Sequence, residues 1–303
     1  MERERGMVLN SMDHMSEYGD ACPSLRSGDI LVNIETTGLR PSSCFIFMAG
    51  WALLGDDPAP DCRTLLAEGR RDEEEMLRSL RDAIAASRRL VLFGAYSFVL
   101  RFLSERWMNY DDGEFLPEGT EVLCLQKALS RWKDALDLRS LRKYDLEEKL
   151  GFCRNDRISG EELIRVYSEW EKERSEACCG RLLAHSAEDL RSLAFLSRLL
   201  VFREFTKDPE GTLEEMQLLG SGVLSLKLSC NRTFPCSAAW DNGFASVNLS
   251  GSTAALRVPC YSGTLKYFLP GKVSDYYYLP DEDCAVHRSV ARFVDRDHRV
   301  KAV

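Results

Sequence analysis

An amide and a carboxylate lie two positions apart in the apolar run DILVNIETTGL, which begins at Asp29. Successive side chains of a β-strand point to opposite faces, so Asn33 and Glu35 are expected to share one face. Two oxygen donors on one face suit a hard divalent cation such as Mg²⁺. By itself this spacing is a weak signal for a metal site.

A second pair of reactive side chains, His185 and Asp189, lies in the helical stretch AHSAEDLRSLAFLSRLLVF. Residues four apart share one face of a helix, so a titratable base and a carboxylate would meet in one cleft. The ordinary alternative for such a pair is a salt bridge on the protein surface. The sequence leaves both interpretations open.

The elements that must position these residues follow from hydrophobic periodicity. Three short apolar runs that begin near residues 29, 44 and 62 predict a meander of strands, EEEMLRSLRDAIAAS predicts a helix from Glu73, and RRLVLFGAYSF predicts a further strand. Three helical stretches follow, and Ser159 is the expected N-cap of the second. The β-β-β-α-β order with a helical second half predicts an α/β domain over residues 29–205.

Four segments together resemble the DEDD-type 3′-5′ exonucleases, and in particular the YprB-like ribonuclease H-like domain proteins. In that group a first strand FDIETTGL is followed by a YNGxxFD junction, a segment LGxxRxDxxSGxELIxxY and an HNxxD helix. This chain has NIETTGL at 33–39, FGAYSFVL at 93–100, LGFCRNDRISGEELIRVY at 150–167 and HSAED at 185–189. The resemblance extends from about residue 29 to 204.

The resemblance implies a mixed five-stranded sheet flanked by helices. In working members four carboxylates hold two divalent ions that activate a water, which a nearby His or Tyr orients or deprotonates. Carried over to this chain, Glu35 and Asp189 would be the catalytic and metal-binding carboxylates, and His185 the base. The implied cofactor of an active site is Mg²⁺ or Mn²⁺.

The same resemblance places the nucleic acid against the end of the first strand, at Thr36, Thr37 and Gly38. Gly38 would suit a tight turn with positive φ. A plain turn without a role in substrate binding explains these residues equally well.

Two of the four carboxylates are missing from this chain. Asn33 stands where the first aspartate is expected and Val99 where the second is expected, and Cys124 replaces a further helpful acid. Mg²⁺ requires anionic oxygen ligands, so the site keeps roughly half of its intended negative charge. The candidates for replacing the lost carboxylates are Glu121, Asp145 and Asp156, each of which suits a surface position as well.

The last third of the chain has a different residue pattern, typical of β-strands. Residues 1–28 are expected to be a leader or one short strand, and residues 206–303 a smaller β-rich domain in which LSLKLSC, FASVNLS, AALRVPC and TLKYFLP alternate at period two. EDCAVHRSVARFVDRDHRVKA predicts a terminal helix, capped by Asp281 to Asp283. This part of the chain could bind single-stranded nucleic acid through an aromatic and basic edge, or simply form a solvated surface. The edge would consist of Tyr276 to Tyr278, Arg288, Arg292 and Arg296.

Composition narrows the class of protein. The 303 residues are 45% hydrophobic and 29% charged, with a formal net charge of −8, which excludes a disordered chain or bulk attraction to nucleic acid or membranes. The N-terminal residues lack the apolar core of a signal peptide, and no run of about 18 apolar residues occurs, so a cytoplasmic protein without a membrane partner is expected. The eleven cysteines show no zinc spacing.

Three functions remain open at this point. The first is an impaired or inactive nuclease-family protein that retains binding of single-stranded DNA or RNA, or of a protein partner. The second is an active metal-dependent 3′-5′ exonuclease with an unusual ligand set. The third is an interaction scaffold that uses its β-rich part and never contacts nucleic acid.

Overall fold

The computed structural model describes residues 2–4, 7–11, 24–55, 61–94, 96–220, 222–263 and 269–302. The chain separates into two compact units, residues 1–259 and residues 260–303. The predicted boundary at residues 205 and 206 lies within α7 (Leu200–Lys207), inside the first unit. The three-part division of the chain stays a prediction.

The first unit is built on a mixed sheet with the strand order β1-β2-β5-β4-β3-β6-β7. Its strands are β1 (Glu2–Glu4), β2 (Met7–Ser11), β3 (Asp29–Thr36), β4 (Ile46–Leu53), β5 (Asp61–Ala67), β6 (Arg89–Leu92) and β7 (Glu121–Cys124). The five strands β3 to β7 form the predicted mixed sheet, because β3, β4 and β5 pair antiparallel whereas β6 and β7 continue parallel to β3. The N-terminal stretch adds the hairpin of β1 and β2 to the edge at β5.

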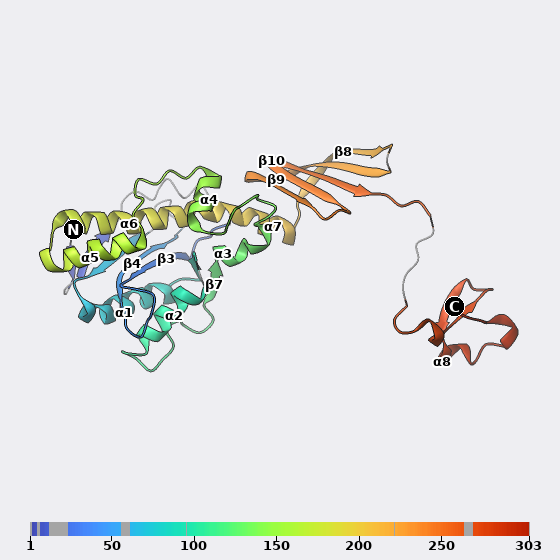
Figure 1. The fold of residues 1–303 in the computed structure, drawn as a ribbon, viewed down its shortest axis with the longest axis horizontal. Coiled ribbons are helices and arrows are strands. Elements are labelled where there is room, and N and C mark those ends of the chain that lie inside the picture. The colour runs from blue at the N-terminus through green and yellow to red at the C-terminus, as the bar shows by residue number, and fades with distance from the viewer. Residues whose placement is uncertain are drawn as a thin grey trace. The chain divides into compact units, whose positions relative to one another are not determined.

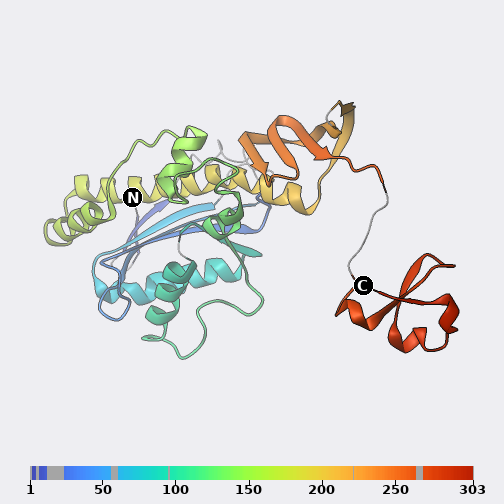
Figure 2. The same ribbon diagram turned by 45° about the vertical axis from the view of Figure 1, so that its right-hand side comes forward.

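Helices cover both faces of this sheet (Figures 1 and 2). On one face lie α1 (Glu73–Ala85) and α2 (Tyr96–Trp107), and on the other lie α5 (Gly160–Glu173) and α6 (Glu176–Leu196). Burial on both faces explains why β4 is an almost uninterrupted apolar run rather than an alternating one. The helix predicted from Glu73 and the later helices α5 and α6 are confirmed. The strand predicted for RRLVLFGAYSF ends at Leu92, and its last residues begin α2 instead.

Local sequence signals determine where these helices begin and which face they bury. Ser159 caps α5 as predicted, since its Oγ accepts the backbone N–H of Glu162 at 3.2 Å. The expected apolar stripe of α1, including Met76 and Leu80, packs against the alternate β3 residues that point toward that helix. Side chains on the opposite face of β3, Asn33 and Glu35 among them, therefore point toward α6.

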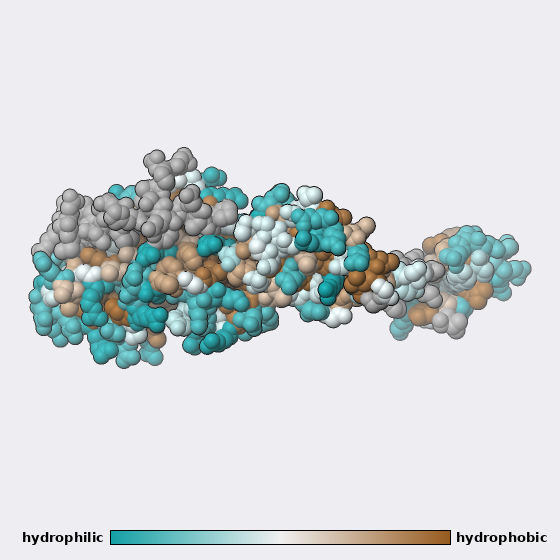
Figure 3. Space-filling model, turned by 90° about the horizontal axis from the view of Figure 1, so that it is seen from above, coloured by the Kyte–Doolittle hydropathy of each residue, from teal (hydrophilic) through white to brown (hydrophobic). Residues whose placement is uncertain are grey.

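Two short helices, α3 (Leu125–Ala128) and α4 (Lys143–Leu150), lead from β7 toward α5. After α7 the chain forms an antiparallel sheet of three strands, β8 (Gly211–Leu219), β9 (Val223–Asp241) and β10 (Ser246–Pro259). The predicted period-two segments FASVNLS and AALRVPC both lie in the single strand β10, and most of TLKYFLP lies outside the described residues. Hydrophobic side chains lie among hydrophilic ones over the β8 to β10 sheet in Figure 3.

The second unit corrects the prediction of a terminal helix. Within the described residues 282–302, only α8 (Arg288–Ala291) is α-helical. The strand β12 (Cys284–His287) pairs with β11 (Tyr276–Leu279), and β13 (Val300–Lys301) pairs with β11 on its other side. Pairing with the tyrosine strand overrides the local helical pattern. The predicted cap is also wrong, because the N-cap of α8 is His287, whose ring accepts the N–H of Ser289.

No helix among the described residues is long and apolar enough to cross a membrane.

Candidate active site

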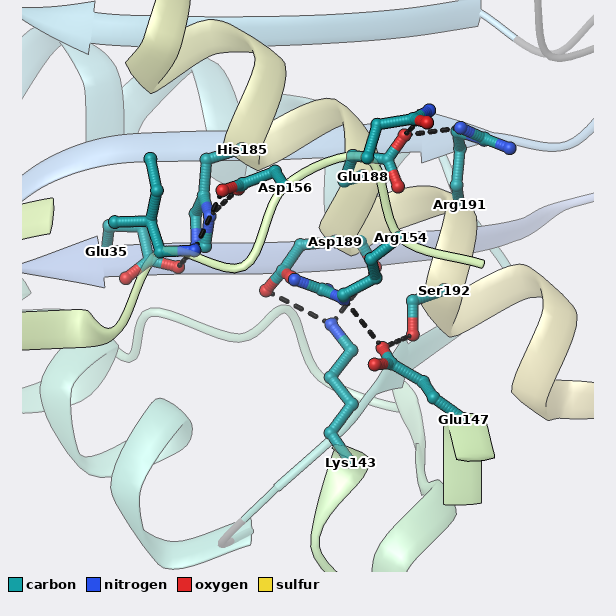
Figure 4. Close-up of polar contacts among 12 residues, drawn as sticks. Glu35, Lys143, Glu147, Arg154, Asp156, His185, Glu188, Asp189, Arg191 and Ser192 are labelled. Carbon is teal, nitrogen blue, oxygen red and sulfur yellow. Dashed lines mark hydrogen bonds and ion pairs between the residues drawn. The ribbon is translucent and has the colours of Figure 1, made fainter. Parts of the chain in front are cut away.

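The first strand and the long helix α6 bring the predicted site residues together. Ser186 Oγ on α6 donates to Asn33 Oδ1 at 3.3 Å, and His185 Nε2 lies 3.7 Å from Glu35 Oε1. Asn33 and Glu35 thus share one face of β3, as predicted from their spacing. Asp189 follows one turn after His185 on the same side of α6 (Figure 4).

A glycine in β4 allows α6 to approach the sheet closely enough for these contacts. A Cβ atom built on Gly50 would lie 2.3 Å from Ser186 Oγ and 2.4 Å from Asn33 Oδ1. Ser186 Oγ also lies 3.2 Å from Thr64 Oγ1 on β5. Hydroxyls and the missing Cβ of Gly50 therefore set the distance between α6 and the sheet.

His185 is held between two carboxylates in a nearly buried position. Its Nδ1 bonds to Asp156, and its Nε2 faces Glu35. The two carboxylates on opposite sides of the ring favour its protonated form. Burial alone would lower the pKa of His185, but Glu35, Asp189 and Asp156 outweigh it and raise the pKa to about 9. Burial is also the largest influence on Glu35, and it raises the pKa of that carboxyl.

Two further cationic side chains form ion pairs with Asp189, the predicted fourth carboxylate. Lys143 Nζ lies 3.1 Å from Asp189 Oδ2, and Arg154 bonds to Asp189 Oδ1. Burial raises the pKa of Asp189, but the charges of Lys143 and Arg154 outweigh it and lower the pKa to about 2. Arg154 Nε also bonds to Glu147 at 3.0 Å, and Ser192 donates to the same carboxylate (Figure 4). Asp189 is therefore an internal ion-pair acceptor rather than a free ligand.

The donor set does not fit a pair of divalent ions. Donor atoms of Glu35, His185 and Asp189 do lie within 4.8 Å of one another. However, protonated nitrogens cannot ligate, and the oxygens of Asp189 already hold two cations. Asn33 brings no charge, and its buried Nδ2 has no hydrogen-bond partner among the described residues. Two ions that each require anionic oxygens would find Asp189 paired with two cations and Glu35 facing His185.

The second-motif position offers no donor atom either. Val99 lies in α2, half buried, and packs against the apolar cluster between α1, α2 and the sheet. Cys124 ends β7, and its thiol donates to the carbonyl of Gly94 at 3.0 Å. Both positions are used for packing.

The turn after β3 is stabilised by its own side chains. Thr36 Oγ1 donates to the carbonyl of Gly38 at 2.7 Å, and Thr37 Oγ1 accepts the N–H of Phe45 at 3.1 Å. The expected positive φ at Gly38 is wrong. Its lack of a side chain instead makes room for Cys44, whose Sγ would lie 2.6 Å from a Cβ at that position. A role of this turn in substrate binding stays a prediction.

Of the three acids considered as compensation, one lies in the site. Asp156 contacts His185, whereas Asp145 accepts from Ser140. Glu121 pairs in register with Arg89 at the start of β6, so it lies at the other end of the sheet from Glu35. Lys143 and Arg154, which no sequence argument selected, complete the site; the only available signal was that Arg154 lies within the matched segment 150–167.

A family model described as the RNase H superfamily matches residues 30–201, more than half of the chain. No curated protein matches the chain. Among solved structures it is similar to the family B DNA polymerase from the hyperthermophilic archaeon Pyrobaculum calidifontis, with 13% identity and a TM-score of 0.42 over 86% of this chain and 39% of the polymerase.

The chain is also similar to Brucella melitensis NrnC bound to pGG, with 16% identity and a TM-score of 0.28 over 59% of this chain and 88% of NrnC. NrnC with bound Mg²⁺ gives 15% identity and a TM-score of 0.29 over 61% and 90% of the two chains. TM-scores below 0.5 are too low for any of these structures to support an inference about this chain.

Proposed function

This chain belongs to the RNase H superfamily, and we propose that it binds single-stranded nucleic acid at its former nuclease centre without hydrolysing it. The observation that carries the proposal is the pairing of both Asp189 oxygens with Lys143 and Arg154. In a two-metal nuclease the ions neutralise the carboxylates and let a phosphodiester approach. Here cationic side chains perform that neutralisation.

The charges of the centre nearly balance without a metal. The centre contains four carboxylates and three cationic groups. His185 contacts Glu35 and Asp156. Lys143 and Arg154 both form ion pairs with Asp189. The fourth carboxylate, Glu147, shares Arg154. A phosphate therefore meets little of the repulsion that four bare carboxylates would exert. Without a bound metal, the centre lacks the group that would activate the attacking water.

The test is nucleic-acid binding in the presence and absence of divalent metal. Fluorescence anisotropy of a 5′-labelled single-stranded DNA and the matching RNA should give the same affinity in Mg²⁺ and in excess EDTA. Lys143→Ala uncovers Asp189 and should weaken binding by about fivefold to tenfold, equivalent to roughly 1 kcal/mol. Lys149→Ala removes the same charge from the same helix and should change affinity by less than about twofold. Binding that EDTA abolishes would overturn the proposal.

One observation favours a second candidate function. Because donor atoms of Glu35, His185 and Asp189 lie within 4.8 Å of one another, a metal that displaces the proton of His185 would find three ligands. This candidate is an active Mg²⁺- or Mn²⁺-dependent 3′-5′ exonuclease, and it requires cleavage that Glu35→Ala abolishes.

The scaffold function is distinguished by the same binding experiment. A scaffold that contacts only proteins, through the β-rich part of the chain, predicts no salt-dependent binding of either strand. Absence of binding in both Mg²⁺ and EDTA would therefore favour the scaffold over both nucleic-acid functions.

A further inference from the structure

A cavity of about 950 Å³ lies at the end of the sheet opposite Glu35. The register that pairs Asp29 with Arg89, and Arg89 with Glu121, places it at the start of β3, β6 and β7. Asp29 and Glu35 lie six positions apart on β3, a distance of about 20 Å at roughly 3.3 Å per residue. The cavity is lined by six cationic side chains, Arg26, Arg89, Arg198, Arg203, Lys207 and Arg232.

Two of these cations are fixed in ion pairs that form the walls. Arg89 bonds to Asp29 through Nε at 2.9 Å and Nη2 at 2.5 Å, and Asp29 is almost completely buried. Arg232 on β9 bonds to Glu204 on α7 at 3.1 Å, and Ser24 Oγ donates to the same Glu204 oxygen at 2.9 Å. These bonds hold the strand ends, α7 and β9 in place around the cavity.

The other four cations, Arg26, Arg198, Arg203 and Lys207, form no ion pair with the described part of the chain. Arg203 and Lys207 are four residues apart on α7, so they share the helix face that lines the cavity. The guanidinium of Arg198 stacks over Phe195 at 5.0 Å, which restrains the side chain without using its N–H donors. The cavity therefore presents cations whose donors are not satisfied by acids.

Three acids that form no ion pair with another described residue, Glu121, Asp208 and Glu210, also line the cavity. Four unpaired cations against three unpaired acids leave a positive surplus in a chain whose formal net charge is −8. The mixture suits a ligand with both a phosphate and hydroxyl groups, because arginine binds phosphate through two parallel hydrogen bonds and carboxylates accept hydrogen bonds from hydroxyls. The volume is that of a typical small-ligand site.

We propose that this cavity binds the phosphate of a nucleotide, supplied either by a free nucleoside phosphate or by the end of a single strand. The site is separate from the proposed function, since none of its lining residues contacts the Glu35 and Asp189 centre. Arg203 and Lys207 bind the phosphate, with Arg26 and Arg198 completing its positive surroundings. The paired Arg89 and Arg232 maintain the shape of the cavity.

The experiment uses the full chain and two probes, inorganic pyrophosphate and a labelled single-stranded 12-mer with a 5′-phosphate. Binding of each is measured by calorimetry and anisotropy to wild type, to R203A/K207A and to R165A/K172A, a matched loss of two exposed charges on α5. The cavity variant should bind at least about tenfold more weakly, whereas the α5 variant should match wild type. R203K/K207R, which keeps both charges, should retain binding and separates charge loss from misfolding.

The two probes distinguish the source of the phosphate. Loss of pyrophosphate binding in R203A/K207A would support the proposal and identify free phosphate compounds as ligands. Loss confined to the 12-mer, with a smaller salt slope, would support it and identify a strand end. Failure of wild type to bind either probe, or equal affinities of the two double variants, would overturn it. Lys143→Ala should leave pyrophosphate affinity unchanged, so a failure here is distinguishable from a failure of the proposed function.

Discussion

The two ends of β3 use charged residues in opposite ways. At the Glu35 end, Lys143, Arg154 and His185 are largely buried and each contacts a carboxylate. At the Asp29 end, four of the six cations that line the cavity form no ion pair within the described ranges of the chain. Buried charges must be paired, because an isolated charge costs several kcal/mol to desolvate. The charges at the Glu35 end therefore stabilise one another inside the fold, whereas the cavity presents cations that a ligand could reach.

The largest expected effect tests the pairing at the Glu35 end. Arg154→Ala leaves Glu147 and Asp189 without their shared guanidinium and should lower the free energy of unfolding by about 3 to 5 kcal/mol, measured by urea denaturation. Arg157→Ala, an exposed arginine of the same loop, should cost less than about 0.5 kcal/mol. Equal losses of unfolding free energy in the two variants would show that the ion pairs of Arg154 do not stabilise the fold more than an exposed arginine does.

The next effect is the pH dependence of stability. The pKa of His185 is about 9 in the fold and about 6.5 when unfolded, so its stabilising charge is fully present below pH 6.5 and is lost as pH rises through 9. The difference corresponds to about 3 kcal/mol across that window. Denaturation of wild type should show this decline, whereas His185→Gln should be nearly flat. A histidine pKa near 6.5, measured by NMR titration, would contradict the imidazolium assignment.

A smaller effect concerns the approach of α6 to the sheet. Gly50→Ala places a methyl group 2.3 Å from Ser186 Oγ and should lower the free energy of unfolding by about 1 to 3 kcal/mol. Gly180, on α6 itself, has open space at its Cβ position, so Gly180→Ala should raise stability by about 0.5 to 1 kcal/mol. Thermal denaturation of the two variants compares them directly, and a stabilising Gly50→Ala would show that the close approach is not required.

The smallest effect is expected at the cavity. R203A/K207A removes two cations that have no acid partner among the residues that the structure describes, so the free energy of unfolding should change by less than about 0.5 kcal/mol per residue. Urea denaturation at low and at physiological salt checks this. A loss comparable to that of Arg154→Ala would mean that these cations are structural, like those at the other end of β3.

Local patterns predicted most of the first unit, because its strands and helices carry clear period-two and helical spacing. The joint placement of Glu35, His185 and Asp189 also followed from the spacing and the resemblance. The ion pairs did not, since Lys143 lies 46 residues and Arg154 lies 35 residues before Asp189, and only the tertiary fold brings them together.

Two other features were out of reach of local patterns for related reasons. A terminal helix was predicted for EDCAVHRSVARFVDRDHRVKA, but part of this segment pairs with β11 as a strand. The cavity is assembled from segments as distant as Arg26 and Arg232, and each of its cations in isolation resembles an ordinary surface residue. Sites built from several separated segments need the fold before they can be recognised.

The proposed function requires that the centre at Glu35 does not support metal-dependent hydrolysis. The most direct measurement follows a 5′-labelled single-stranded DNA and the matching RNA with Mg²⁺ and with Mn²⁺, using wild type, Glu35→Ala and the N33D/V99D variant. We expect wild type and Glu35→Ala to leave both strands intact to the same extent. Cleavage by wild type that Glu35→Ala abolishes would contradict the proposed function. Cleavage by N33D/V99D alone would show that wild type is inactive because the two carboxylates are missing.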